Sequence, residues 1–445
     1  MKNIEQNYEH GDKKNEEWTV KSKQRKIMEL KVNGSPERMA NRWLSITFSS
    51  LRIRDYRIYW IGQLISLTGS WMQSVALGWL VLILTNSPFY LGLAGFAGSI
   101  PVLFFSLFGG VLADRFSKRN LLITTQTFAM VQAFILAGLT ISKAVNVWHI
   151  LFLATFLGTV NAIDAPTRQS FIAEIVSKEY LTNAIALNST MFNSARIIGP
   201  ALAGILMAVI GISGIFIING ISFLAVIWSL FLINSVKINS NNSHDSIWEN
   251  LKEGFKYVKN NRLIISIIIL VASFSVFGTS YMMLMPVFAR DILQVGASGL
   301  GFLMAFSGIG ALIGALSLAS LGDYKKKGLL LTAGNLVLPI TLFFFAISKS
   351  FTISSIFIFG VGWSMITQMA SANSLIQSIV PDNLRGRVMS LYTLTFFGMM
   401  PIGSIQAGII AELIGAPLTV CLGAILCAIV AAGILVYVPE LRSHE

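Results

Sequence analysis

Residues 199–211 read GPALAGILMAVIG, and residues 403–415 read GSIQAGIIAELIG. An offset of 204 residues aligns the two stretches with six identical positions. The same offset places FIAEIV at 171–176 over LIQSIV at 375–380. A repeat at one fixed spacing predicts that a single structural element occurs twice, once in each half of the chain. Both longer copies are almost wholly apolar, so the repeated element is expected to be a membrane helix.

The composition predicts that the whole chain is an integral membrane protein. Of its 445 residues, 54% are hydrophobic and only 12% are charged, and the mean hydropathy is +0.69. A helix needs about 20 residues to cross a hydrocarbon layer of roughly 30 Å. We therefore predict an all-α fold with twelve transmembrane helices in two pseudo-symmetric six-helix bundles. The expected spans are 57–84, 88–113, 120–142, 146–165, 183–210, 213–234, 263–289, 298–321, 328–348, 352–376, 388–411 and 416–437.

These spans divide the chain into five segments. The segments are a cytoplasmic N-terminal tail and lead-in at 1–54, a first bundle at 55–234, a cytoplasmic central loop at 235–262, a second bundle at 263–438 and a cytoplasmic C-terminal tail at 439–445. The lead-in RMANRWLSITFSSLRIRDYR mixes apolar and basic residues, and it is either an amphipathic segment on the membrane surface or an unstructured tether. In the central loop, SIWENLKEGFKYVKNN has apolar residues at helical spacing, which predicts a surface helix that bridges the halves.

The distribution of charge decides between a membrane role and a nucleic-acid role for this chain of net charge +12. With the N-terminus placed inside, 29 of the 33 Lys and Arg residues fall on inner segments and 3 on outer loops. Such an excess of positive charge on one side is typical of cytoplasmic loops, so both termini are expected in the cytoplasm. A nucleic-acid partner is not expected, because the sequence shows no clustered basic face with a folded reader.

The loop between the second and third spans contains GGVLADRFSKRN at 109–120. It resembles the loop signature of the major facilitator superfamily, in which Gly, Asp-Arg, a small residue and two basic residues follow one another; Ser117 stands where the pattern usually has Gly. SLGDYKKKG at 320–328 is a degenerate copy at the equivalent place in the second half. The resemblance implies the facilitator fold and a gating role for the matching residues, which are Gly110, Asp114, Arg115, Lys118, Arg119 and, in the second copy, Asp323.

Three longer stretches narrow the resemblance. They are VNAIDAPTRQSFIAEIV at 160–176, LTNAIALNSTMFNSARIIGPALAG at 181–204 and VPDNLRGRVMSLYTLTFFGMMPIGS at 380–404. These stretches are similar to the enterobactin-exporter and macrolide-efflux type of facilitator. The resemblance implies export of a drug, a siderophore or another bulky organic molecule from a bacterial inner or plasma membrane, powered by an ion gradient.

Arg196 is the unusual residue of the repeated element, because it places a full charge in the middle of an expected span. Such a charge costs between about 3 and over 10 kcal/mol unless it meets water or a partner. Arg196 is therefore predicted to face a central cleft, on one helical face with Ser189 and Asn193, and to act on cargo or in coupling. The alternatives are a strut bonded to carbonyls or to Asp164, and a side chain that snorkels. The repeat mate of Arg196 is Met400, so the charge belongs to one half only.

Gating residues are predicted in two places. Gly199 and Pro200 remove one backbone hydrogen bond and permit close helix contact on the cleft side, with plain small-residue packing as the alternative. Asp114 is expected to accept backbone N–H groups of the next helix, while the basic residues after it hold neighbouring helix ends; the alternative is a charge that only sets topology. Arg385 and Arg387 are expected to make the matching contacts in the other half.

Coupling to protons is supported mainly by the resemblance. Proton antiport usually needs a carboxylate or histidine whose pKa changes with access. Asp164 is the best such candidate, but it falls at the expected inner end of the fourth span, and no acid is expected at mid-membrane. Further polar residues are candidates to line the transport route: Gln63, Gln73, Tyr281, Gln368 and Asn373.

The hypothesis that unites these observations is a secondary active exporter, coupled to protons, that rocks two halves about a central cleft. The sequence contains no phosphate-binding Gly-Lys-Ser/Thr loop, no His-Glu-x-x-His and no Cys-x-x-Cys, so we expect no enzyme activity, cofactor or metal. The expected partners are the lipid bilayer, a small-molecule cargo and protons, with the chain acting as a monomer. Two alternatives remain, an importer of an organic anion anchored by Arg196 and a membrane sensor or scaffold that transports nothing.

Overall fold

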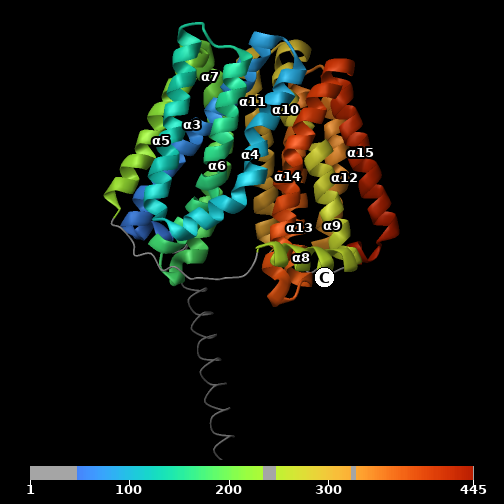
Figure 1. Ribbon diagram of the computed structural model, residues 1–445. Helices are drawn as coiled ribbons and strands as arrows, with labels where there is room; N and C mark the ends of the chain where they lie inside the picture. The colour runs from blue at the N-terminus through green and yellow to red at the C-terminus, as the bar shows by residue number, and fades with distance from the viewer. Residues whose placement is uncertain (1–47, 234–246, 322–326, 444–445) are drawn as a thin grey trace, which may run out of the picture.

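The computed structural model describes residues 48–233, 247–321 and 327–443, which are almost entirely helical (Figure 1). The helices are η1 (Ser49–Arg52), α3 (Arg54–Thr85), α4 (Pro88–Arg115), α5 (Lys118–Ile141), α6 (Val147–Ile175), α7 (Lys178–Leu232), α8 (Ile247–Asn260), α9 (Arg262–Ser273), η2 (Phe274–Gly278), α10 (Ser280–Val287), η3 (Phe288–Ile292), α11 (Gly296–Leu321), α12 (Lys327–Ile347), α13 (Phe351–Ile379), α14 (Asp382–Ile414), α15 (Ala416–Tyr437) and α16 (Glu440–Ser443). Asp323 and most of the N-terminal tail with its lead-in lie outside the described residues.

The helices of the described residues account for twelve membrane crossings. Eleven helical stretches are long and apolar enough to span a membrane, and one of them joins α9, η2, α10 and η3. The stretch α7 has 55 residues and consists of two helices joined at Gly211. The backbone φ of Gly211 is 71°, a left-handed value that glycine adopts readily and other residues rarely do. Because α7 counts twice, the predicted twelve helices and the all-α fold class are confirmed.

Two bundles stand side by side, one built from α3 to α7 and the other from α9 to α15 (Figure 1). In the first bundle α3 packs along α7 and α4 along α6; in the second, α11 and α12 both pack along α13. Small residues bring backbones together, as where a Cβ built on Gly62 of α3 would lie 2.8 Å from the Ala225 carbonyl oxygen of α7. Close backbone contact of this kind is the usual basis of helix association in lipid, where burial of apolar surface supplies little drive.

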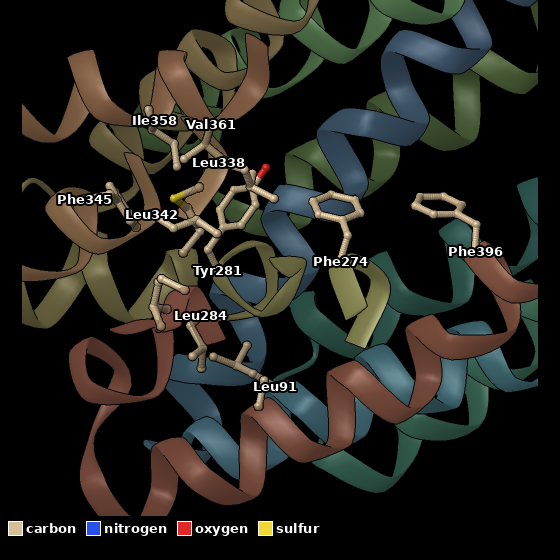
Figure 2. Close-up of a cluster of buried hydrophobic side chains, with 14 of the residues drawn as sticks. Leu91, Phe274, Tyr281, Leu284, Leu338, Leu342, Phe345, Ile358, Val361 and Phe396 are labelled. Carbon is tan, nitrogen blue, oxygen red and sulfur yellow. The ribbon is translucent and has the colours of Figure 1, made fainter. Parts of the chain in front are cut away.

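A continuous apolar core fills the second bundle and extends into the first (Figure 2). Phe274 of η2 and Phe396 of α14 stack with their ring centroids 6.3 Å apart. Tyr281 of α10 is 1% exposed and lies among leucines of the same core (Figure 2). Leu91 of α4 also belongs to this cluster, so the core crosses from one bundle to the other.

Some helices continue well past the apolar runs that predicted them. α6 ends at Ile175 instead of 165, and α14 begins at Asp382 instead of 388. These predicted boundaries were wrong because hydropathy marks where the hydrocarbon stops, whereas a helix keeps its own hydrogen bonds as it continues into water. As a result Asp164 lies eleven residues before the end of α6, well inside the helix rather than at its end.

The helix expected in the central loop is α8, and its position differs from the prediction. Within the described residues α8 packs on α14 and α9, both in the second bundle, instead of bridging the halves. A Cβ built on Gly254 would lie 3.2 Å from the Arg387 backbone oxygen, and Glu253 forms an ion pair with Arg387. The charge pair and the close approach attach α8 to the beginning of α14.

Candidate functional site between the two bundles

Hydrogen bonds join the two bundles at the upper end in Figure 1, where α3 ends at Thr85. The five that the described residues contain run from Ser87 and Phe89 to Glu412, from Arg290 to Leu82 and Asn86, and from Ser298 to Gly204, with donor–acceptor distances of 2.6, 3.2, 3.1, 2.5 and 3.0 Å. In the same described ranges, neither a hydrogen bond nor an ion pair joins the bundles at the lower end, where α3 begins. Among the described residues, the bundles are therefore bonded to each other at the upper end only.

Two backbone crossings close the same end, and both use a glycine of the repeated element. A Cβ built on Gly204 of α7 would lie 3.0 Å from the Cα of Gly301 in α11. Gly408 of α14, the repeat mate of Gly204, crosses Gly92 of α4, where the same measure is 2.8 Å. A side chain at either crossing would push the helices apart. The identical glycines of the repeat thus have one structural role, which is to let each bundle touch the other.

A pocket lies between the bundles on the lower side of these crossings, with Arg196 of α7 in its wall. It measures about 390 Å³ when the open solvent in its mouth is included. Its other lining residues come from α3, α10, α11 and α13: Trp71, Tyr281, Met282, Met285, Met304, Ser307, Gly308 and Met365. Both bundles therefore build the pocket, and most of its wall is apolar.

The guanidinium group of Arg196 has buried nitrogen atoms without a partner. Nε and Nη2 are shielded from solvent, and neither donates a hydrogen bond within the described residues. The pocket lining contains no Asp or Glu. The Tyr281 hydroxyl lies 3.4 Å from the Ser307 hydroxyl, at the outer limit of a hydrogen bond. Arg196 is therefore an uncompensated positive charge at the place where the two bundles meet, and it does not snorkel to a surface.

Asp164 does not pair with Arg196, so the predicted strut between these two residues is wrong. The Asp164 carboxylate forms an ion pair with Arg168 at 2.5 Å and accepts hydrogen bonds from Thr125 at 2.8 Å and Gln126 at 2.7 Å. Residues four apart on a helix share a face, which explains why Arg168 takes this position. Asp164 is 2% exposed and is the only buried carboxylate among the described residues.

The second bundle has no counterpart of this ion pair. Asp164 corresponds to Gln368 of α13, which is equally buried and donates to Asn335 of α12 at 2.9 Å. Arg168 corresponds to Ala372 by the same offset. The second bundle therefore places a neutral amide and a methyl group where the first bundle places two opposite charges. The charges of Asp164 and Arg168 are a property of one half, as the charge of Arg196 is.

The family profile described as "Transmembrane secretion effector" matches residues 45–445, which is most of the chain. The chain belongs to this family. The fold, with twelve crossings in two bundles, is that of the major facilitator superfamily, and its structural neighbours are transporters of that fold. The protein is a multi-pass membrane transporter.

Relatives of this transporter, and solved structures of other proteins with a similar fold, agree with that assignment. The staphyloferrin A transporter of Staphylococcus aureus (strain NCTC 8325 / PS 47) is 28% identical, over 78% of this chain and 87% of that protein. Macrolide efflux protein A of Streptococcus pyogenes is 23% identical, over 83% of this chain and 92% of that protein. A bacterial homologue of the iron transporter ferroportin, solved in an inward-facing state, has a TM-score of 0.68 and 14% identity, over 88% of this chain and 99% of that structure.

In this transporter the glutamines predicted to line the route lie inside the bundles instead. Gln63 is 2% exposed within the first bundle. Gln73 is also buried there and donates to Gln132 of α5 at 3.0 Å. Gln368 is bonded inside the second bundle, as described above. The amides of Gln73 and Gln368 hold neighbouring helices together, and none of the three glutamines is part of the pocket lining.

Three other predicted residues lie on the lower side of the pocket. Ser189 is exposed one helical turn below Asn193, whose side chain donates to the Ser189 carbonyl at 2.9 Å. Asn373 of α13 is half-buried and accepts a hydrogen bond from Gln377 at 2.5 Å. Ser189 and the two asparagines are not part of the pocket lining. Of the uncharged residues that were predicted to line the route, only Tyr281 is part of it.

The basic residues of the loop signature hold helix ends, whereas its acid does not cap a helix. Asp114 is exposed and has no hydrogen bond or ion pair with any described residue, so the predicted capping of α5 is wrong for this conformation. Lys118 pairs with Glu174 near the end of α6, and Arg119 donates to the Leu230 carbonyl near the end of α7 at 2.6 Å. These contacts tie together the lower ends of helices within the first bundle.

The other predicted gating residues interact with nearby segments of the chain or with no described residue. A Cβ built on Gly110 would meet no atom within 4 Å, and Arg115 is exposed. Arg385 pairs with Asp382 of its own helix at 2.5 Å. Arg387 holds α8, as described above. The two arginines of α14 therefore do not make contacts like those of Lys118 and Arg119, because one pairs within the start of α14 and the other pairs with α8.

Gly199 and Pro200 point in different directions. A Cβ on Gly199 would lie 2.5 Å from the Trp71 Cβ, so this glycine packs against α3 of its own bundle. The Pro200 carbonyl oxygen instead contacts Gly301 of α11 across the bundle interface. The prediction of one cleft-facing stripe is wrong for Gly199, because consecutive residues of a helix point about 100° apart.

Four methionines around Arg196 were missed by the sequence analysis. Met282 and Met285 come from α10, Met304 from α11 and Met365 from α13. Methionine side chains are flexible and polarizable, so they adapt to apolar surfaces of different shape. The run MMLM at 282–285, beside Tyr281, was the available signal. A methionine in an apolar span gives no indication of which neighbour it will face, so the signal was too weak alone.

Proposed function

We propose that this transporter is a secondary active exporter of a bulky organic molecule and works by alternating access. The observation that carries the proposal is the pocket around Arg196, which both bundles build beside the contacts that join them at one end. A central site approached from one side at a time is what alternating access requires. The staphyloferrin A transporter and the macrolide efflux protein among the relatives support an organic cargo and outward movement.

The lower end belongs in the cytoplasm. In that orientation 29 of the 33 Lys and Arg residues lie on cytoplasmic segments, which is the arrangement that membrane insertion favours. Both termini then lie in the cytoplasm as well, and the described conformation is inward-facing. Cargo would reach the pocket from the cytoplasm, as export requires.

Conversion to the outward-facing state requires the upper contacts to break and lower contacts to form. The upper contacts are five hydrogen bonds and two glycine crossings. Each hydrogen bond contributes only about 0.5–1.5 kcal/mol net, so new contacts elsewhere can offset their loss. Asp114 has no described partner in the inward-facing state, and we assign it a contact that forms when the lower ends close.

Protons are the proposed coupling ion, and Asp164 is the proposed residue that binds them. It is the only buried carboxylate among the described residues, and it forms an ion pair with Arg168. Protonation of Asp164 would release Arg168 from the pair and change the charge inside the first bundle. The neutral residues at the matching positions of the second bundle support a functional rather than a structural need for these charges.

The double variant Asp164→Gln with Arg168→Ala tests this coupling, because it copies Gln368 and Ala372 of the second bundle. We expect it to fold and to exchange cargo across proteoliposomes without a gradient, but to lose accumulation driven by a pH gradient. The single variant Asp164→Asn leaves the half-buried Arg168 without its anionic partner, so it should lower the free energy of unfolding by less than the about 3–5 kcal/mol typical of a fully buried pair. Gradient-driven accumulation at the wild-type rate in the double variant would exclude Asp164 as the proton site.

Export itself is tested with proteoliposomes that hold the purified protein under an imposed pH gradient. The panel is erythromycin, the cationic dye ethidium and the anionic dye carboxyfluorescein, with protein-free liposomes as the control. Movement of at least one compound, in the outward sense in vesicles of known orientation, is the expected result. Movement only in the inward sense would favour an importer. If no compound moves and a drug and siderophore susceptibility panel on cells shows no effect, a sensor or scaffold is the better hypothesis.

A further inference from the structure

The groups that surround Arg196 in the pocket indicate the charge of the cargo. We infer that the cargo bears an anionic group of the carboxylate type, which binds the free edge of the Arg196 guanidinium. The inference rests on the proposed export function and adds the chemical class of the molecule that is exported.

Every element around Arg196 contributes neutral side chains. α3 supplies Trp71, α13 supplies Met365, and α10 and α11 supply methionines, hydroxyls and a glycine. Asp164, the only buried carboxylate in the described part of the chain, is already bonded to Arg168 and to two neutral donors. The positive charge of Arg196 is therefore not neutralised by the described residues. A bound anion would neutralise it, whereas a cation would be repelled and a neutral group would leave the buried charge unpaired.

The free donors of Arg196 have the geometry that a carboxylate recognises. Nε and Nη2 lie on the same edge of the planar guanidinium group, and both are buried and unbonded within the described residues. A carboxylate can accept both donors at once through its two oxygens, with a fixed orientation. The hydroxyls of Tyr281 and Ser307, only weakly bonded to each other at 3.4 Å, supply further donors from the opposite bundle. The anion would then contact both bundles.

The room in the pocket places the anionic group at one end of a larger molecule. The enclosed cavity of the pocket has a volume of only about 20 Å³, which is enough for little more than one small group. The rest of a bulky cargo must lie in the mouth of the pocket and toward the lower end. The four methionines at the pocket can adapt to an apolar portion next to the anion.

Binding of three probes with the same ring tests the inference on purified, full-length protein in detergent. The probes are naphthalene-2-carboxylate, naphthalene-2-carboxamide and 2-naphthylmethylammonium, and equilibrium dialysis gives the dissociation constants. We expect the carboxylate to bind at least about tenfold more tightly than the amide, which is a usual effect of a charge-assisted pair, and the ammonium to bind most weakly. Arg196→Gln should remove the difference between carboxylate and amide, and Arg196→Lys should keep part of it.

An exposed arginine of the same bundle provides the control. Arg57→Gln lowers the net charge as much as Arg196→Gln does, and it should leave the preference for the carboxylate unchanged. Thermal unfolding of each variant shows whether it is folded, and Arg196→Met serves if Arg196→Gln is not. Equal binding of carboxylate and amide by the wild type, absence of carboxylate binding, or a preference that survives in both neutral variants would overturn the inference.

A transport measurement separates this inference from the export function. Proteoliposomes that export carboxyfluorescein in preference to ethidium, with inhibition by naphthalene-2-carboxylate but not by the amide, are the expected result. If the wild type exports ethidium or erythromycin and the carboxylate does not compete, the anionic cargo is refuted while export stands. If the carboxylate binds through Arg196 but no compound is transported, the anion site stands and the proposed export function fails.

Discussion

Arg196 occupies the contact between the bundles, and two nitrogens of its guanidinium are buried without a described partner. A charge of this kind is retained in a membrane protein when it serves a function, because its burial otherwise destabilises the fold. Its repeat mate Met400, which is half-buried in α14, shows that an apolar side chain of similar length suits the same position. Replacement of Arg196 by methionine therefore copies a residue that the second bundle already has at the equivalent position.

Arg196→Met should abolish transport while membrane insertion and folding remain intact. The substitution copies the second bundle and removes only the charge and its hydrogen-bond donors, so the methionine-rich wall can accept it. The measurement compares the transport rate of the compound that the wild type moves fastest with the thermal unfolding midpoint of each protein. Met400→Leu, a swap of similar volume on the other bundle, is the control and should retain transport. A wild-type rate in Arg196→Met would refute a direct role for the arginine.

At the scale of elements, the helix pairs α4 with α14 and α7 with α11 form the interface that the proposed mechanism requires to open. Each pair crosses at a glycine of the repeat, Gly408 in one and Gly204 in the other. A smooth backbone surface lets two helices touch and separate without interlocking side chains, so the crossing can open during transport. The same interface holds the hydrogen bonds of Glu412, which lie near the end of the helices where water can replace them.

Gly408→Leu should shift the transporter toward the outward-open state. A Cβ at this position would lie 2.8 Å from the Gly92 Cα, so a full side chain prevents the upper end from closing. A cysteine introduced at Ser87 should react faster with a membrane-impermeant maleimide added from outside in this variant than in the parent. Gly433→Leu is the matched control, because a Cβ on Gly433 meets no atom within 4 Å. Equal labelling rates in both variants would show that the crossing does not control closure.

Asp114→Asn should slow turnover more than it weakens binding of cargo from the cytoplasm. Asp114 is exposed and has no partner among the described residues, so its loss leaves the pocket unchanged. The contact assigned to it forms only when the lower ends close, and weakening that contact slows the conversion between states. The measurement compares the turnover rate with the dissociation constant of the same cargo. Unchanged turnover would reduce Asp114 to a residue that only sets topology.

For the whole molecule, the arrangement of twelve crossings was predictable because it depends on local properties of the chain. Apolar runs of sufficient length identify the spans, and the offset of 204 residues identifies the duplication. Gly211 sets the break in α7 through its own backbone preference, which a sequence also shows. The predicted ends of α6 and α14 failed because helices extend beyond the hydrocarbon that hydropathy detects.

The candidate site was only partly predictable, because side-chain partners depend on which faces of distant helices meet. Arg196 and Tyr281 were identified, since a charge or a polar ring in an apolar span stands out. Gln73 was placed in the route by its polarity, although its amide bonds inside its own bundle. The ion pair of Asp164 with Arg168, in contrast, follows from their spacing of four residues within α6, which the sequence contains.

The sequence by itself determined the membrane class, the two-fold repeat and the presence of charges in only one half, because these follow from residue types and their spacing along one chain. Only the tertiary structure decided that Gly204 and Gly408 close the upper end, that Thr125 and Gln126 of α5 bond to Asp164, and that Arg196 is left among methionines without a described partner. The physical reason is that a buried charge acts through its nearest neighbours, and packing brings those neighbours from α3, α10, α11 and α13, far away in the chain.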